Sequence, residues 1–392
     1  MKPIILAIVL MNAVGMSLVI PLLPFLVGKY MPAEQVVVGM SALMSVFAAC
    51  TFIAAPIFGA LSDRYGRRNI LMISLLGSVA GYVLFGIGGS LWMLFLGRII
   101  DGLTAGNIST LFAIITDITA PEERTKWFGY MGAVMGIGLL AGPALGGLLG
   151  AVSLSMPFFI TAGIIFLSCI AVYGVLPETL QPEKRTTHLT IGSFNIFSHL
   201  SALKEIKFLF ILGMFFYAGL EVFQSNLTIL LKDIFKWGPA YVGGLLTLAG
   251  GCDIFSRAVL LPFLLKRLNE RITGQTGIFL LGTGLLFIVA AMLLSSLILI
   301  ALAVICILFG EGLFDPTYNS LLSQSVDESN QGKIQGVNQS LRSCIRVLIP
   351  LGAATLYYYS PCILYIVATC SLITAFIMYG KNGTFQHATS GI

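Results

Sequence analysis

The chain carries twelve long apolar runs, and this feature limits most strongly what it can fold into. The first extends from about Ile4 to Val27 and the last from about Ile363 to Tyr379, and polar connections, all but one of them short, join successive runs. A helix needs roughly 20 mostly apolar residues to cross a bilayer. Lipid offers the backbone no hydrogen-bonding partner, and the runs lack the alternation typical of barrel strands. The pattern therefore predicts an all-α membrane protein with twelve transmembrane helices.

The composition supports the same class. Apolar residues make up 57% of the chain and charged residues 10%, against roughly 45–50% and 25% in soluble domains. The net charge of +5 is small, and no basic stripe is interleaved with aromatics, so we expect a lipid bilayer and no nucleic acid as partner. Basic residues concentrate in the connections on one side, leaving Lys29, Lys232 and Lys236 on the other. This bias predicts that both termini are cytoplasmic.

A long polar connection separates two sets of six runs. We predict three parts: an N-terminal six-helix half over residues 1–178, a cytoplasmic linker over 179–206 and a C-terminal six-helix half over 207–392. A shift of 203 residues lays Arg64 and Arg68 onto Arg267 and Arg271, which is a faint internal repeat. Two related halves about a central cavity are typical of secondary transporters.

Nine ionisable side chains fall inside the predicted spans, where an isolated charge costs about 3 kcal/mol. They are Arg98, Asp101, Glu221, Asp253, Arg257, Glu311, Asp315, Arg342 and Arg346. Asp253 and Arg257 stand at i,i+4 and share a helix face, so we predict a buried ion pair between them. Arg98 and Asp101 share a face at i,i+3.

Like-charged pairs occur on two consecutive spans. Glu311 with Asp315, and Arg342 with Arg346, would repel each other unless the two helices meet. Glycines also interrupt two spans beside carboxylates, at 102–106 and 310–316, which predicts weakened helix next to a binding site. Ion pairs and close packing that only stabilise the bundle are the structural alternative.

The first basic connection has a specific pattern. Residues 59–68 read Gly-Ala-Leu-Ser-Asp-Arg-Tyr-Gly-Arg-Arg and match the signature loop of the major facilitator superfamily. Leu96-Gly97-Arg98, followed by Gly102, resembles that superfamily's arginine motif, which is linked with proton transfer. The resemblance implies the major facilitator fold, with two pseudo-symmetric six-helix halves.

A third motif in the fifth run resembles the antiporter motif of exporters. It consists of Gly138, Gly142, Pro143, Gly146 and Gly147. Proline cannot donate its backbone bond and the glycines admit a neighbouring helix closely, so packing alone also accounts for the pattern. Only the resemblance connects the motif with the direction of transport.

Most of the chain resembles the twelve-span drug/proton antiporters, the tetracycline/proton antiporters among them. That resemblance implies a conformational charge relay, which we assign to Asp63, Arg64, Arg67, Arg68 and Asp117. The tetracycline exporters have an aspartate before the Ala-Val-Gly of the first span, where this chain has Asn12. Their cavity is lined mainly by spans 1, 4, 7 and 10, and spans 4, 7 and 10 carry acids here.

We therefore expect a proton-coupled antiporter that exports small amphiphilic compounds or drugs by alternating access. The candidate proton-coupling residues are Asp101, Arg98, Glu221, Glu311 and Asp315. The candidate substrate-binding residues are Asn12, Glu221, Tyr217, Phe223, Glu311, Asp315, Arg342 and Arg346. The alternative is an exporter or exchanger of an anionic or zwitterionic metabolite, such as a siderophore, sugar or amino-acid derivative, held by the intramembrane arginines.

An enzyme is not expected. The three histidines lie in the predicted linker and tail, the seven cysteines lie inside apolar runs, and no span has the spacing of metal ligands or a nucleophile. We expect no metal and no cofactor, since the proton gradient supplies the energy. We expect a monomer in the bacterial inner membrane.

Overall fold

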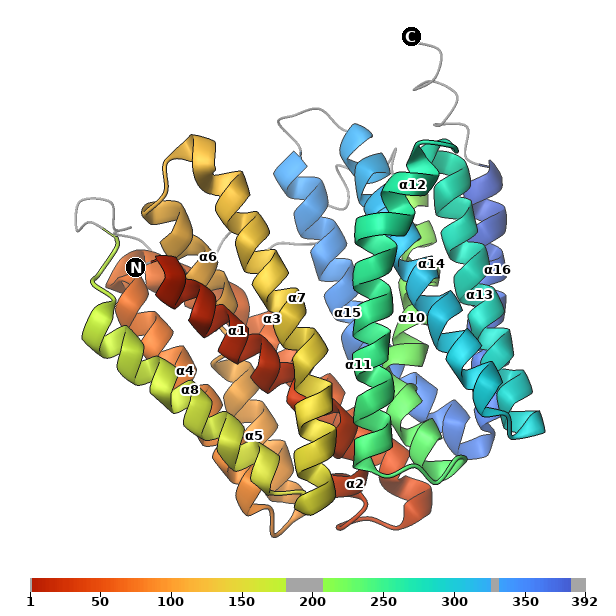
Figure 1. The fold of residues 1–392 in the computed structure, drawn as a ribbon, viewed down its shortest axis with the longest axis horizontal. Coiled ribbons are helices and arrows are strands. Elements are labelled where there is room, and N and C mark those ends of the chain that lie inside the picture. The colour runs from red at the N-terminus through yellow and green to blue at the C-terminus, as the bar shows by residue number, and fades with distance from the viewer. Residues whose placement is uncertain (1, 181–206, 326–330, 382–392) are drawn as a thin grey trace. The chain divides into compact units, whose positions relative to one another are not determined.

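The computed structural model of the chain describes residues 2–180, 207–325 and 331–381, and its regular elements there are all helices (Figure 1). Eleven stretches of helix in these ranges are long and apolar enough to cross a membrane. The helix α15 (Gln331–Tyr359) is also of membrane length, with 29 residues, but is more polar because it carries Arg342 and Arg346. The predicted all-α multi-pass membrane protein is confirmed.

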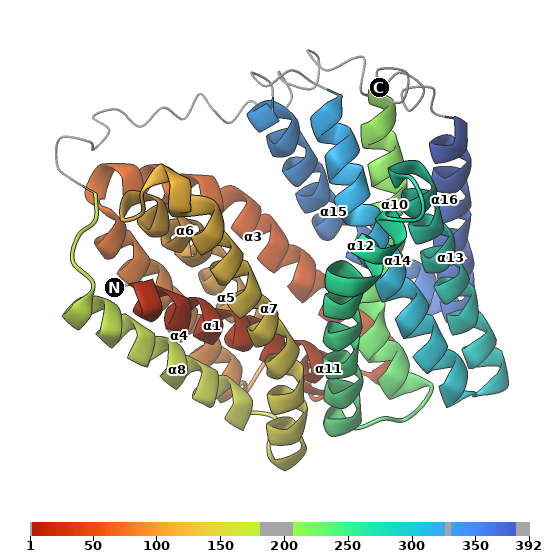
Figure 2. The same cartoon turned by 45° about the horizontal axis from the view of Figure 1, so that its top comes forward.

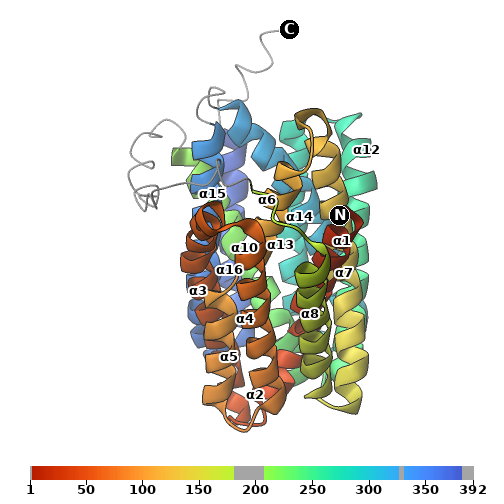
Figure 3. The ribbon, with the colours of Figure 1, turned by 90° about the vertical axis from the view of Figure 1, so that its left-hand side faces the viewer.

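The described residues divide into two compact units. The first contains residues 236–248 and the following helices: α1 (Lys2–Leu18), α2 (Leu23–Val27), α3 (Val36–Tyr65), α4 (Arg67–Ile87), α5 (Leu91–Leu103), α6 (Asn107–Asp117), α7 (Pro121–Val152) and α8 (Met156–Val175), with 3-10 turns at Ile20–Leu22 and Ala33–Gln35. Within it, α1 packs against α7 and α8, and α4 packs against α5 and α8. In Figure 3, α5, α4 and α8 of this unit stand side by side, facing the viewer.

The second unit contains α10 (Lys207–Asp233), the last part of α11 (Pro239–Phe255), the π-helix η6 (Ser256–Leu260), α12 (Leu261–Leu265), α13 (Glu270–Leu294), α14 (Leu297–Gln324), α15 and α16 (Pro361–Lys381). Here α13 packs against α14 and α16, and α10 packs against α15 and α16, as Figure 2 also shows. The predicted linker falls mostly on 181–206, outside the described residues, so its boundaries stay a prediction.

Two spans of the first unit are broken where the sequence carries helix-breaking residues. Pro21 and Pro24 lie in the 3-10 turn and short helix that follow α1, as expected of residues without a backbone donor. The fourth span is interrupted between α5 and α6, where the Ser74 hydroxyl donates to the Thr104 carbonyl and accepts from the Gly106 amide. The weakened helix predicted over 102–106 is therefore present.

The matching prediction for residues 310–316 is wrong, because α14 continues without a break through Pro316. The glycines here serve packing: a Cβ on Gly310 would approach the Leu281 amide nitrogen to 2.7 Å, and one on Gly312 would overlap Ser256. The irregular backbone of this unit lies instead at η6, which ends two residues before Pro262; such π-turns are frequent at functional sites.

Candidate functional site

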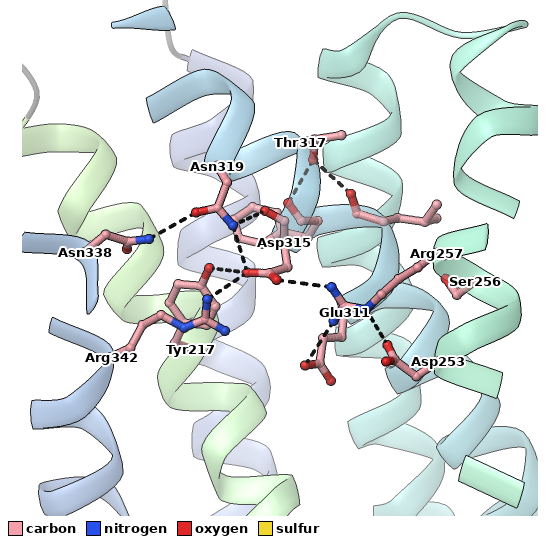
Figure 4. Close-up of polar contacts among 12 residues, drawn as sticks. Tyr217, Asp253, Ser256, Arg257, Glu311, Asp315, Thr317, Asn319, Asn338 and Arg342 are labelled. Carbon is pink, nitrogen blue, oxygen red and sulfur yellow. Dashed lines mark hydrogen bonds and ion pairs between the residues drawn. The ribbon is translucent and has the colours of Figure 1, made fainter. Parts of the chain in front are cut away.

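Asp315 is the centre of the polar site in the second unit (Figure 4). Its carboxylate accepts a hydrogen bond from the Tyr217 hydroxyl at 2.7 Å and pairs with Arg342 at 3.1 Å and with Arg257 at 3.2 Å. The Asn319 amide adds a longer contact at 3.3 Å. These partners come from α10, η6, α14 and α15, so one carboxylate joins four elements. Its side chain is only 13% exposed. The partners offset the cost that an unpaired charge would have in lipid.

Arg257 connects Asp315 to two further acids. Its guanidinium pairs with Asp253 at 2.9 Å and with Glu311 at 3.5 Å. The predicted pair of Asp253 and Arg257 is therefore formed, but its side chains are 32% and 35% exposed, so it is not the isolated buried pair that the sequence predicted. Arg257 lies in η6 and faces α14, which carries Glu311 and Asp315, while Asp253 lies one turn earlier on α11.

Three carboxylates and two guanidinium groups thus form one charge cluster, consisting of Asp253, Arg257, Glu311, Asp315 and Arg342. The helices that carry like-charged pairs do meet, at Asp315 and Arg342, as the sequence required. With every member ionised, the cluster carries one more negative than positive charge. A single proton would balance it.

A small pocket lies beside the charge cluster. Its lining comes from α10, α14 and α15: Tyr217, Leu220, Glu221, Gln224, Glu311, Arg342, Ile345 and Arg346. Five of the eight predicted substrate-binding residues line this pocket. Asp315 lies behind it in the charge cluster, and Phe223 is buried on α10 without reaching the pocket, so that part of the prediction finds no support.

The first unit holds a separate carboxylate, Asp101 on α5. It is 9% exposed and accepts a hydrogen bond from the Ser78 hydroxyl at 2.7 Å. Arg98 lies 3.9 Å away, with its guanidinium packed over the rings of Phe47 and Phe85 at 5.0 and 4.9 Å from their centres. The sequence placed the acid and the arginine on one face, and the serine on α4 completes the group.

The signature loop centres on Arg67. Its guanidinium pairs with Asp63 one turn earlier and with Asp117 at 3.1 Å, and donates to the Ser62 hydroxyl at 2.7 Å. Arg68 instead donates to the carbonyl of Tyr173, and Arg64 stacks on the neighbouring ring of Tyr65. The geometry of the predicted relay is thus built by Asp63, Arg67 and Asp117.

Two further residues belong to these groups and were missed from the sequence. Glu178 accepts from the backbone amides of Arg67 and Arg68 at 2.9 and 3.2 Å, closing the start of α4 where amides lack partners. Asn107, the first residue after the break in the fourth span, donates its amide to the side chain of Asn12. The first amides of a helix lack hydrogen-bond acceptors, so a carboxylate was to be expected near Arg67. Nothing in the sequence indicated that Glu178 would supply it.

The antiporter-like motif lies inside the unbroken α7 and packs against α1. A Cβ on Gly138 would come within 2.6 Å of the Ala13 Cβ, and one on Gly142 within 2.8 Å of the Val14 carbonyl oxygen. Gly146 meets the Leu18 carbonyl in the same way, whereas Gly147 faces the first turns of α11 within the same unit. The Ser17 hydroxyl donates across the contact to the Gly138 carbonyl at 3.1 Å. The glycines therefore allow two backbones to touch.

Comparisons with known proteins agree with the fold and the motifs. The family model for the Major Facilitator Superfamily matches residues 5–350. The class D tetracycline resistance protein of Salmonella ordonez is 35% identical over 89% of this chain and 88% of its own length. Multidrug resistance protein 2 of Bacillus subtilis is 25% identical over 88% and 86%.

Among solved structures, the nucleoside transporter NupG superposes with a TM-score of 0.79, covering 96% of this chain and 98% of that one at 12% identity. A likeness at that identity concerns the fold alone, and it matches the predicted major facilitator fold. Together with the family model and the signature loop built around Arg67, these matches establish that the chain belongs to the major facilitator superfamily.

Proposed function

We propose that the chain is a proton-coupled antiporter that exports small amphiphilic compounds from the bacterial cytoplasm by alternating access. The relatives named as tetracycline and multidrug resistance proteins support export of drugs. The observation that carries proton coupling is the charge cluster, in which three carboxylates share two guanidinium groups inside the membrane. An excess charge is costly in lipid, so the cluster favours taking up one proton.

Glu311 is the member of the cluster best placed to carry that proton. Its only ion pair among the described residues is the 3.5 Å contact to Arg257, the longest in the cluster, and it lines the pocket. Asp315, by contrast, is held by two arginines and a tyrosine. Asp101, held by a serine and only loosely paired with Arg98, is the candidate for a second proton site in the first unit.

One proton supplies enough energy for such export. Moving it inward through about 100 mV yields about 2.3 kcal/mol, and one pH unit adds about 1.4 kcal/mol. The total of about 3.7 kcal/mol can hold a neutral compound at a gradient of several hundredfold. No bound cofactor is needed. In this proposal both termini lie in the cytoplasm, the chain acts as a monomer, and the Asp63, Arg67 and Asp117 contacts stabilise one of the two alternating states.

The experiment is proton release from inside-out vesicles with an acidified lumen, to which cationic, neutral and anionic compounds are added in turn. Compounds that are exported should release protons from wild-type vesicles. Glu311→Gln balances the charge of the cluster without a proton, so proton release should be lost while the chain still folds. Asp101→Asn tests the second proton site in the same way. Glu34→Gln, an exposed acid outside the predicted spans, is the matched control. Full release with both Glu311 and Asp101 neutralised would refute the proposed coupling.

A further inference from the structure

We propose that the pocket of the second unit binds a zwitterion, with a cationic amine at Glu221 and an anionic group at Arg346. The inference rests on the proposed function, because it names the substrate class of that transporter. It also separates two tasks: the charge cluster handles the proton, while Glu221, Gln224 and Arg346 hold the substrate.

The pocket is built by two facing helical stripes. Tyr217, Glu221 and Gln224 stand at i, i+4 and i+7 on α10, and so lie on one face of that helix. Arg342 and Arg346 stand at i and i+4 on α15, which packs against α10. Both stripes line the same pocket, so their polar ends converge on one space.

The charged groups of the pocket differ in whether they already have partners. Arg342 pairs with Asp315 at 3.1 Å and lies over the ring of Tyr217, 4.3 Å from its centre. Glu311 pairs with Arg257. Glu221 and Arg346 attract each other electrostatically, but within the described part of the chain neither charged group makes a hydrogen bond or a direct ion pair.

The burial of these two groups indicates where each end of a ligand would lie. Glu221 is only 9% exposed, so its carboxylate, which makes no hydrogen bond or direct ion pair among the described residues, lies deep in the pocket. A buried carboxylate without a partner is costly, and a ligand ammonium would remove that cost. Arg346 and Gln224 are exposed at the pocket's edge, where the planar guanidinium can donate hydrogen bonds to a carboxylate or phenolate.

Glu221 and Arg346 present opposite charges to one pocket without direct contact, so a ligand that carries both charges can satisfy each group at once. A purely cationic compound leaves Arg346 unpaired, and a purely anionic one leaves Glu221 unpaired. The aliphatic side chains of Leu220 and Ile345 and the ring of Tyr217 supply apolar contacts, so the body of the ligand is expected to be apolar or aromatic.

Binding to the purified full-length chain, measured without any gradient, tests the inference. The probes are three fluorescent compounds of matched shape: norfloxacin, which is a zwitterion, its ethyl ester, which keeps only the amine charge, and its N-acetyl derivative, which keeps only the carboxylate. Since a hydrogen bond to a charged group is lost in each derivative, the zwitterion should bind roughly tenfold to a hundredfold tighter than either.

The variants locate each charge. Glu221→Gln should remove the preference over the N-acetyl derivative, and Arg346→Gln the preference over the ester; Arg346→Lys should restore part of it. Because Arg346 is exposed, its variants remain informative even if the chain lacking Glu221 does not fold. Glu34→Gln and Lys29→Gln, exposed charges outside the pocket, should change nothing.

The inference is overturned if the wild-type chain binds the zwitterion no tighter than its derivatives, or if both neutralised variants keep the wild-type preference. Proton release by singly charged compounds, with no zwitterion preference in binding, would sink this inference and leave the proposed antiport intact. A clear binding preference for the zwitterion, without proton release by any compound, would support this inference and refute the proposed antiport.

Discussion

Gly142→Ala should destabilise the first unit, because α1 and α7 touch at this glycine. The new Cβ would lie 2.8 Å from the Val14 carbonyl oxygen and 2.9 Å from the Leu18 amide nitrogen, where 3.4–4 Å is ordinary contact. It would also overlap the Ser17 hydroxyl, which bonds to the Ala13 and Gly138 carbonyls at 2.8 and 3.1 Å. Two backbone atoms cannot give way, so the helices must separate by about half an ångström or more.

The cost can be estimated from its parts. Overpacking costs about 1–3 kcal/mol and a displaced hydroxyl hydrogen bond about 1 kcal/mol, while alanine gains about 1 kcal/mol over glycine in a helix. The net loss is about 2 kcal/mol, which corresponds to a fall in Tm of roughly 4–8 °C for a unit of this size. Gly136→Ala, on the same helix with nothing within 4 Å, keeps only the helical gain and should leave Tm unchanged or slightly higher.

The assay is thermal unfolding of the full-length chain in detergent, with both variants heated at the same rate as wild type. Equal Tm values for the two variants would refute the packing argument. If Gly142→Ala kept the wild-type Tm and still lost export, the motif would act in transport beyond packing.

Three further substitutions test the remaining contacts. Asp315→Asn leaves Arg342 without its ion-pair partner and should lower the free energy of unfolding by about 3 kcal/mol. Asp253 is one-third exposed, so Asp253→Asn should cost less than about 1 kcal/mol. Equal costs in a denaturation series would contradict the central place of Asp315. In Arg67→Lys, the lysine cannot contact Ser62, Asp63 and Asp117 together as the arginine does. Initial export rates should therefore fall several-fold at an unchanged substrate Kd. A raised Kd would count against a role in the conformational cycle. Ser78→Ala removes the 2.7 Å hydrogen bond to Asp101 and should slow proton-driven export several-fold. Ser78→Thr keeps that hydrogen bond and should export at the wild-type rate. Export insensitive to both substitutions would remove Ser78 and Asp101 from the coupling path.

The architecture was predictable because lipid imposes a simple rule on the chain: every span must be long, apolar and helical. The same rule made the intramembrane charges conspicuous, and spacing along one helix correctly paired Asp253 with Arg257. The break at residues 104–106 was likewise visible from its glycines.

What could not be predicted depends on contacts between helices. Glycine weakens a helix and also permits close packing, so sequence alone could not separate the break after Gly102 from the packing role of Gly310 and Gly312. Nor could it show that Arg257 lies in a π-turn that packs against α14, or that Phe223 does not line the pocket, because the register between helices is set by packing over the whole unit.

The uneven charge count of the cluster has an evolutionary consequence. Losing either outer acid, Asp253 or Glu311, leaves equal numbers of acids and arginines, so selection for a folded, inserted protein has little reason to keep both. Only selection for coupled export retains the third carboxylate. Lineages freed from that selection should lose an outer acid first, while Asp315 and the two arginines persist.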